Sequence, residues 1–392
     1  MVAVGTLTFK DFSGINNQAD TSRLEAGELA SAINMDVDDA RQLRARAGHV
    51  LLTADNAHSL FGMGQVLYYR NDSTLKRFDI AASSAAVIDT GLTGDTAYAS
   101  LLDNLFYTDG QRARTFSMAQ GAQDWGIVPP PKPQVQEAAG NLPPGDYLVS
   151  ATYLGGDESG APTPVQISIT AGGIAVTVPS SVQTGVTGKA IYLSTTGGEV
   201  LYRAAAVPNH DAAVVVGSPA AGAVLETLHK TPPPPGQLLA LWNGKAIVGT
   251  GAFLLYSEPF RYTLFDPLRQ NIAFESAVTM FAALGTAAFV VGTETAVYRF
   301  DGDISTAAMT KIAAHGAIRG AVAVVDAALM RDGVQGLMAV FASPAGICAI
   351  GASGDVMNMT AKRYAPAKPA TSGSAVYVPE RGTHRVLFTL EP

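Results

Sequence analysis

Two proline runs constrain the fold of this chain of 392 residues more than any other feature of its sequence. The first is VPPPKP at residues 128–133, and the second is TPPPPG at residues 231–236. Proline lacks a backbone N–H and has a fixed φ, so neither run can continue a helix or a central strand, and stiff extended spacers are expected instead. The stretch between the runs is long enough for one small domain. We therefore predict one domain inserted into a second, discontinuous domain.

Composition favours turn-rich β structure. Hydrophobic residues make up 47% of the chain and charged residues 15%, with 40 glycines and 22 prolines. Abundant alanine, which prefers helix, weakens this inference. The net charge of −7 argues against a protein that grips nucleic-acid phosphates, although it allows DNA to pass without sticking. The one cysteine, Cys348, excludes an intrachain disulfide, and its apolar neighbours predict a buried structural thiol.

Targeting and membrane signals are not evident. The first residues lack a charged segment followed by an apolar run, so we expect no signal peptide. The apolar stretches are short or interrupted, and none reaches the roughly 20 residues that a membrane helix needs. We expect no membrane insertion.

A strand-turn-strand pattern recurs in both flanks of the chain. Leu67 and Phe106, and likewise Val248 and Val291, are separated by about the 40 residues of a four-stranded propeller blade. Asn243-Gly244 is a strong hairpin signal. Residues 49–128 and 236–392 together have room for about six such blades. The prediction is a discontinuous β-propeller; a sandwich or barrel of unrelated hairpins is the alternative.

The stretch between the proline runs, residues 129–235, has a different pattern of polar and apolar residues from the flanks. Its clearest segment, residues 145–154, alternates polar and apolar side chains, as a half-buried strand does. About seven short strands separated by turns indicate a small fibronectin-type or immunoglobulin-like β-sandwich. Because this stretch contains no cysteine, packing alone must hold it together.

Residues 1–48 predict an N-terminal arm outside the propeller. Residues 7–9 could form a short strand. Leu29 and Ile33 have helical spacing, which predicts a short helix within residues 24–34. Residues 34–38 and the region around Leu43 alternate, with a turn at 38–40, so a hairpin is expected to follow. The predicted fold is thus all-β: arm 1–48, propeller 49–128 and 236–392, and sandwich 129–235.

The sequence carries no recognisable catalytic or metal-binding pattern. The six histidines are scattered, and neither a zinc-protease helix motif nor a nucleophile elbow occurs. Residues 36–39 begin like a calcium loop, but Arg41 stands where that loop needs glycine. Residues 301–303 read as a solvated turn rather than a cation site. The sequence therefore predicts no catalytic residue, cofactor or metal, and no enzyme.

One local basic cluster occurs in the chain, formed by Arg41, Arg44 and Arg46. It could contact DNA or an acidic partner surface, but a solvated hairpin face is the favoured interpretation. Together with Phe12 and Ile15 of the arm, these arginines are the candidate inter-subunit or partner contacts.

Four segments of the arm occur in a specific order. They are FSGINN (12–17), LEAGELA (24–30), AINMDVD (32–38) and LRARAG (43–48). In this order they resemble the opening of tail nozzle (tail tubular B-like) proteins of tailed bacteriophages, although Ala40 stands where glycine is expected. The motif covers about an eighth of the chain. The blade-like flanks and YLGGDES (153–159) are also similar to that family.

The resemblance implies a structural role. Members of the family are β-propellers with platform or immunoglobulin-like modules, and they form homohexameric rings around the tail lumen. It implies that this chain is a virion protein assembled in the host cytoplasm, joining an adaptor ring to tail fibres or a needle. Genomic DNA would pass through the lumen without sequence-specific binding, and inner loops would close the channel until ejection.

Two other function classes stay open. One is a tail-tip protein that binds a receptor or glycan. The other is a propeller enzyme such as a depolymerase, which would need acids or aromatic side chains that converge in the propeller funnel.

Overall fold

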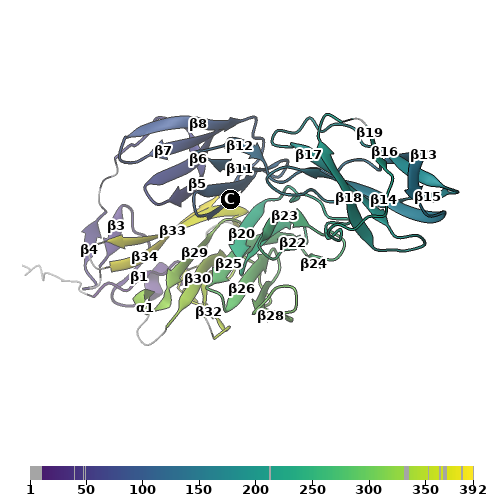
Figure 1. Cartoon of the computed structure of the whole chain (residues 1–392). Coiled ribbons are helices and arrows are strands. Elements are labelled where there is room, and N and C mark those ends of the chain that lie inside the picture. Colours follow the sequence, from purple (N-terminus) through teal and green to yellow (C-terminus); the bar gives the residue numbers. More distant parts are fainter. Residues whose placement is uncertain are drawn as a thin grey trace, which may run out of the picture. The chain divides into compact units, whose positions relative to one another are not determined.

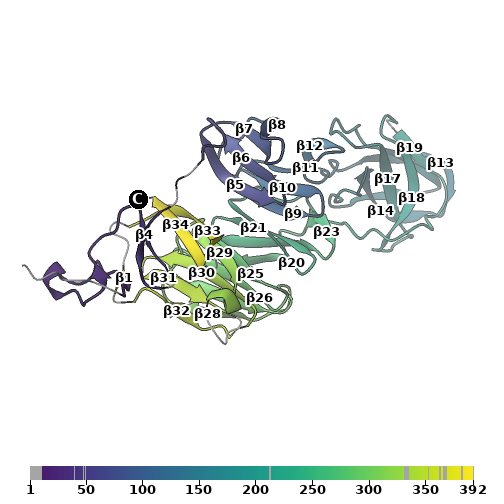
Figure 2. The same cartoon turned by 90° about the vertical axis from the view of Figure 1, so that its left-hand side faces the viewer.

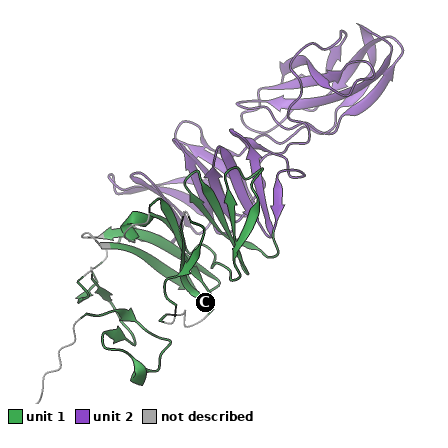
Figure 3. Cartoon of the chain, turned by 90° about the horizontal axis from the view of Figure 1, so that it is seen from below, with its two compact units in different colours: residues 1–55, 274–392 green, residues 56–273 purple. Residues whose placement is uncertain are grey.

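The structure is a computed structural model. It describes residues 11–38, 40–46, 48, 50–211, 213–330, 335–351, 353–361, 363–364, 369–380 and 383–391. The strand expected at residues 7–9 lies outside these ranges, as does Asp39 in the expected turn. The chain divides into two compact units, Asn56–Ala273 and Met1–Asp55 with Phe274–Pro392, which Figure 3 colours separately. Each unit is described by itself below.

Four-stranded antiparallel sheets with consecutive strand order are the main repeating element, and Figure 1 shows their strands side by side. Two belong to the unit of residues 56–273: β5–β8 (Ala57–Met63, Val66–Asn71, Thr74–Asp79, Ser84–Thr90) and β9–β12 (Ala97–Leu101, Asn104–Thr108, Ala113–Ser117, Gly121–Asp124). Two belong to the other unit: β25–β28 (Val278–Leu284, Ala288–Thr293, Val297–Asp301, Met309–Ala313) and β29–β32 (Val322–Asp326, Leu337–Ser343, Gly346–Ile350, Val356–Asn358).

A fifth sheet of this kind has five strands. It consists of β20 (Leu238–Trp242), β21 (Lys245–Thr250), β22 (Phe253–Glu258), β23 (Arg261–Phe265) and β24 (Asn271–Ala273). The β20–β21 hairpin turns at Asn243 and Gly244 with φ of 46° and 74°, as the sequence predicted for this pair. Both β23 and β24 pair with β22.

These sheets confirm the predicted all-β fold of propeller type, because a four-stranded antiparallel meander is the unit of a propeller blade. About six blades were expected, and the described residues form five such sheets. The hairpin of β33 (Ser372–Glu380) and β34 (Thr383–Glu391) has only two strands. It lies against the β29–β32 sheet, visible in Figure 2, and contributes Tyr377, Val386 and Phe388 to the core of that sheet.

The N-terminal arm is built from two small sheets. The parallel pair β1 (Gly14–Ile15) and β2 (Glu28–Leu29) precedes the hairpin of β3 (Met35–Val37) and β4 (Leu43–Ala45), and this hairpin was predicted.

The helix predicted within residues 24–34 is wrong. A 3-10 helix spans Thr21–Arg23 instead, and β2 occupies part of the expected helical segment. Gly27 has a φ of +92°, and a Cβ there would lie 2.5 Å from the Asp11 carbonyl oxygen. The chain therefore turns back on itself at Gly27, which is incompatible with a continuous helix.

The stretch between the proline runs forms two antiparallel sheets. One has the order β13-β16-β19 (Gln134–Leu142, Gly172–Thr177, Ala213–Val216), and the other has the order β15-β14-β17-β18 (Val165–Ile169, Gly145–Leu154, Gly188–Ser194, Leu201–Pro208). Side chains from both sheets form one shared core, including Val149, Ile174 and Val216. Strand β13 escaped the sequence analysis because its residues, QVQEAAGNL, are mostly polar or small. The immunoglobulin or fibronectin class of this stretch stays a prediction.

The chain enters and leaves this stretch at neighbouring positions. A Cβ on Gly126 would lie 3.1 Å from Pro232, and a Cβ on Gly160 would lie 3.2 Å from Pro129. At the last residue of the second proline run, the Gly236 N–H donates to Thr108 Oγ1 over 2.9 Å. The sheet before the prolines and the sheet after them also share one hydrophobic core. This is the geometry that an insertion into a continuous body requires.

Phe265 tests this shared core. It is fully buried and packs edge-on against Trp125, with ring centroids 6.5 Å apart. We expect Phe265→Ala to destabilise the protein by about 3–5 kcal/mol, because it leaves a large cavity between sheets on either side of the insertion. Phe253→Ala is the matched control, since Phe253 is 48% exposed and should cost far less. Thermal and urea unfolding measure both; equal losses would contradict the shared core.

Candidate functional site

Asp36 is the charged centre of the N-terminal arm. Its Oδ1 accepts a hydrogen bond of 2.9 Å from Arg46, which lies just beyond strand β4. Its Oδ2 accepts a second hydrogen bond of 2.9 Å from Arg385 of strand β34. The Arg46 hydrogen bond and the charges of both arginines hold the pKa of Asp36 below its ordinary value. One carboxylate thus joins the β3–β4 hairpin to the β33–β34 hairpin, which Figure 2 shows close together.

Glu28 plays a similar role at the β1–β2 pair. Its Oε2 accepts hydrogen bonds of 3.0 Å from the Glu25 N–H and from the Asn16 side chain. These two bonds, the Glu25 N–H foremost, lower the pKa of Glu28. Arg363 lies 3.9 Å from its other oxygen, and the Asn17 N–H donates to the Arg363 carbonyl over 2.9 Å. The arm is therefore tied to the C-terminal part of its own chain at two places.

The residues predicted as partner contacts lie in this arm. Phe12 is half-buried, and its N–H donates to the Arg41 carbonyl over 2.9 Å. Ile15 is half-buried and pairs with Leu29. The structure thus brings the N-terminal segment and the hairpin together, a proximity that the sequence did not reveal.

The basic cluster is largely neutralised from within the arm. Arg44 lies 2.5 Å from Asp38, and Arg46 lies 2.9 Å from Asp36. Arg41 is exposed, with a φ of 56° at the hairpin turn. Two of the three guanidinium groups therefore already have carboxylate partners, which leaves little free positive charge for a nucleic acid.

Large aliphatic side chains are exposed in the arm and in the segment that follows it. Ile33 is 82% exposed, Val50 84% and Leu51 82%. Exposed aliphatic side chains of this size are candidate contacts with a partner, because exposed apolar patches often mark interaction sites. These residues were not among the predicted contacts, although the apolar run Val50-Leu51-Leu52 is evident in the sequence.

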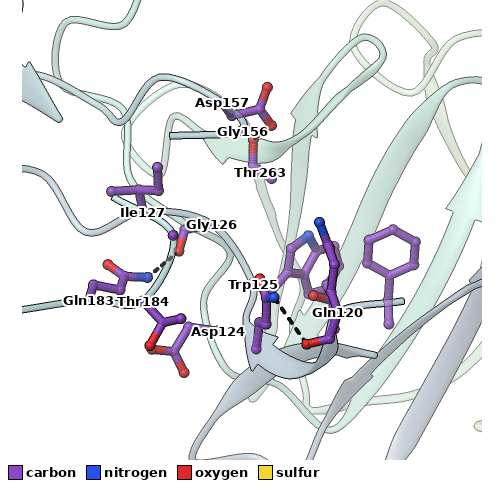
Figure 4. Close-up of a pocket in the computed structure, with 14 residues that line it drawn as sticks. Gln120, Asp124, Trp125, Gly126, Ile127, Gly156, Asp157, Gln183, Thr184 and Thr263 are labelled. Carbon is purple, nitrogen blue, oxygen red and sulfur yellow. Dashed lines mark hydrogen bonds between the residues drawn. The ribbon is translucent and has the colours of Figure 1, made fainter. Parts of the chain in front are cut away.

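A separate pocket lies within the unit of residues 56–273 and is drawn in Figure 4. Its volume is about 340 Å³. It is lined by Phe106, Thr115, Gln120, Gln123, Asp124, Trp125, Gly126, Ile127, Gly156, Asp157, Gln183, Thr184, Gly185 and Thr263. These residues come from the β9–β12 sheet, from residues 125–127 that follow it, from strand β23 and from two loops of the inserted stretch. The pocket therefore exists only once the insertion has packed.

Hydrogen bonds fix the pocket walls. Asp157 accepts a hydrogen bond of 2.8 Å from Thr263. Gln183 donates to the Gly126 carbonyl over 2.7 Å and accepts from the Val128 N–H over 3.0 Å. Figure 4 shows the bond between Gln183 and Gly126. These bonds join the inserted loops to the sheets that carry them, so the lining is held in place before any ligand arrives.

Trp125 is the most unusual member of this lining. Its side chain is only 2% exposed and packs against Phe106, with ring centroids 4.9 Å apart. Its indole nitrogen is buried and has no hydrogen-bond partner among the described residues. A buried donor left without a partner costs about 1–3 kcal/mol. Asp124 beside it is exposed, and its carboxylate lies 3.6 Å from Arg114.

The described residues contain no group of three or more histidine, cysteine or acidic side chains placed to hold a metal. The helices found in them are too short to cross a membrane. Cys348 is fully buried, as predicted, and burial raises the pKa of its thiol to about 11.

Comparisons with known proteins add little. No protein-family model matches the sequence, and no curated protein matches it. Among solved structures, the Pan2 WD40 domain of Neurospora crassa is 10% identical over 82% of this chain and 83% of that one, with a TM-score of 0.33. Apo AztD from Citrobacter koseri is 12% identical over 83% and 78% of the two chains, with a TM-score of 0.32. At these TM-scores neither likeness supports an argument about function.

The Asp36 contacts give a pH-dependent prediction. The folded-state pKa of Asp36 lies below the ordinary 3.8, so its contribution to stability is present above that value and is lost as pH falls through the folded-state pKa. We expect Asp36→Asn to cost about 1 kcal/mol at neutral pH and to cost less as the pH is lowered to about 3. Urea unfolding of both proteins at the two pH values measures this.

The matched control for this measurement is Asp103→Asn. Asp103 is an exposed aspartate outside the arm. We expect this variant to unfold like the parent protein at both pH values. A stability loss in Asp36→Asn that is the same at both pH values would show that the carboxylate charge is not what matters.

Proposed function

We propose that this protein is a structural component of a bacteriophage tail, a nozzle subunit that forms a ring around the channel for DNA ejection. Support comes first from the ordered arm motifs within residues 12–48 and their resemblance to tail nozzle proteins. The propeller-type sheets agree with that resemblance. In this proposal the ring joins an adaptor above to tail fibres or a needle below, and it resides in the virion.

The charge of the chain supports a conduit rather than a nucleic-acid binder. The net charge is −7, and two arginines of the one basic cluster are paired with aspartates of the arm. A channel lined by such a protein would gain little binding free energy from counterion release, so DNA could slide through it.

The observation that carries the ring proposal is the exposure of large aliphatic side chains in the arm and in the segment that follows it. Ile33, Val50 and Leu51 are each more than four-fifths exposed, beside strands that are tied to the chain's own C-terminal part. A ring needs heterologous contacts, in which a patch on one subunit meets a different patch on the next. The arm is held to its own chain by ion pairs, and its exposed apolar side chains could form the first of these patches.

Electron microscopy and light scattering of the purified protein test this proposal. We expect a ring with an axial channel, six-fold if the family resemblance holds. Removal of residues 1–52, which takes away Ile33, Val50 and Leu51, should yield monomers that still unfold cooperatively. A protein that stays monomeric at micromolar concentration with its arm intact would contradict the proposal.

A point variant tests whether assembly depends on the arm or on any exposed aliphatic side chain. We expect Ile33→Arg to weaken ring formation, because it places a charge in an apolar contact. Val182→Arg is the matched control, since Val182 is also a fully exposed aliphatic residue but lies in the inserted stretch. Equal effects of the two variants on assembly would count against the arm as the contact.

A further inference from the structure

We propose that the inserted stretch, residues 129–235, is clamped onto the sheets that carry it by two sets of polar contacts, and that loss of these contacts releases it as a folded module. The proposal goes beyond the ring function and does not depend on it, because every residue involved belongs to the unit of residues 56–273. Proline-rich linkers by themselves act as semi-rigid spacers, and relative motion is the usual behaviour of a module that such linkers join to a body.

The proline runs are packed against their surroundings and are not free spacers. Pro130, Pro133 and Pro233 are buried. At the first residue of the second run, the Thr231 N–H donates to the carbonyl of Phe265 in strand β23 over 2.8 Å, and the Phe265 N–H donates back over 2.9 Å. Two reciprocal backbone hydrogen bonds fix the direction in which the chain returns to the sheets.

We call the first set the stalk contact; it joins Lys230 of the insertion to Glu258 of strand β22. Lys230 Nζ lies 2.7 Å from Glu258 Oε1, and the two side chains are only 14% and 25% exposed. The Gln270 side chain donates to the same Glu258 oxygen over 2.9 Å, which holds the carboxylate in place. An ion pair with so little exposure is screened less by salt than a surface pair. Removal of one partner leaves the other charge poorly solvated in the docked arrangement.

The second set, the loop contact, is made by two loops of the insertion, and Figure 4 shows its residues. Asp157 accepts a hydrogen bond of 2.8 Å from Thr263. Gln183 donates to the Gly126 carbonyl over 2.7 Å and accepts from the Val128 N–H over 3.0 Å. The stalk contact and the loop contact thus hold the insertion at two places, which fixes its orientation as well as its distance.

The insertion and the sheets can both stay folded when these contacts break. The core of the insertion includes Val149 and Ile174, whereas Phe106 and Phe265 belong to the core of the sheets that carry it. The pocket of Figure 4 is lined from both parts, so it is present only in the docked arrangement. The two sets of contacts therefore decide whether the pocket exists.

Distances between two spin labels on the full chain test the proposal. The labels are attached through Met118→Cys in the β9–β12 sheet region and Val182→Cys in the insertion, at side chains that are 74% and 102% exposed. Cys348 is fully buried and escapes labelling. An excess of unlabelled protein restricts the measured distances to one chain, whether or not rings form. We expect a single narrow distance distribution.

Variants that break both sets of contacts should release the insertion. Glu258→Ala removes the ion pair of the stalk contact, and Asp157→Ala removes the hydrogen bond to Thr263 in the loop contact. We expect the combined variant to replace the narrow distribution with a broad one while urea unfolding stays cooperative. Lys230→Met breaks the same ion pair from the insertion side, and together with Asp157→Ala it should have the same effect.

The matched control combines Glu226→Ala with Glu199→Ala. Glu226 lies 3.2 Å from Arg261, but the two side chains are 73% and 42% exposed, and Glu199 is also exposed. Exposed ion pairs contribute little, so the control should keep the narrow distribution. A broad distribution in the parent protein would overturn the proposal, as would a narrow one in both combined variants or equal broadening in the control. None of these outcomes bears on ring formation.

Discussion

The aromatic core around Trp125 is the interaction on which the rest of the unit of residues 56–273 depends. Trp125 packs between Phe106, which precedes the inserted stretch, and Phe265, which follows it. Because the chain returns beside the point where it left, more than one hundred residues can be inserted between these rings without interrupting their packing. The proline runs make this possible, since they can neither pair as central strands nor compete with the sheets on either side.

The same packing creates the pocket. The β9–β12 sheet and strand β23 supply one wall, and the inserted loops around Asp157 and Gln183 supply the other. The orphan indole N–H marks a place where close packing has left a polar group without a partner. Natural proteins retain few such groups, and the packing of the indole ring against Phe106 and Phe265 is a physical reason for its persistence.

The arm is held by a different kind of interaction. It contains few buried side chains, and its two small sheets would be marginal if they were isolated. Carboxylates compensate for this weak core: Asp36 reaches Arg385, and Glu28 reaches Arg363. Charged contacts hold the arm without burying much apolar surface. Ile33, Val50 and Leu51 therefore stay exposed and can contact another molecule. The proposed assembly with other copies of the chain would use these exposed side chains.

The sequence by itself determined many of the strand segments, although not β2 or β13, together with the Asn243-Gly244 hairpin, the buried Cys348 and the positions of the proline breaks. These depend on local periodicity, turn chemistry and proline geometry, which act over a few residues. Tertiary structure alone decided that Gly27 turns where a helix was predicted, that Asp36 meets Arg385, and that Gln120, Trp125 and Asp157 line one pocket. The sequence carries no short-range trace of these contacts, because they join segments that come together only when separate sheets pack.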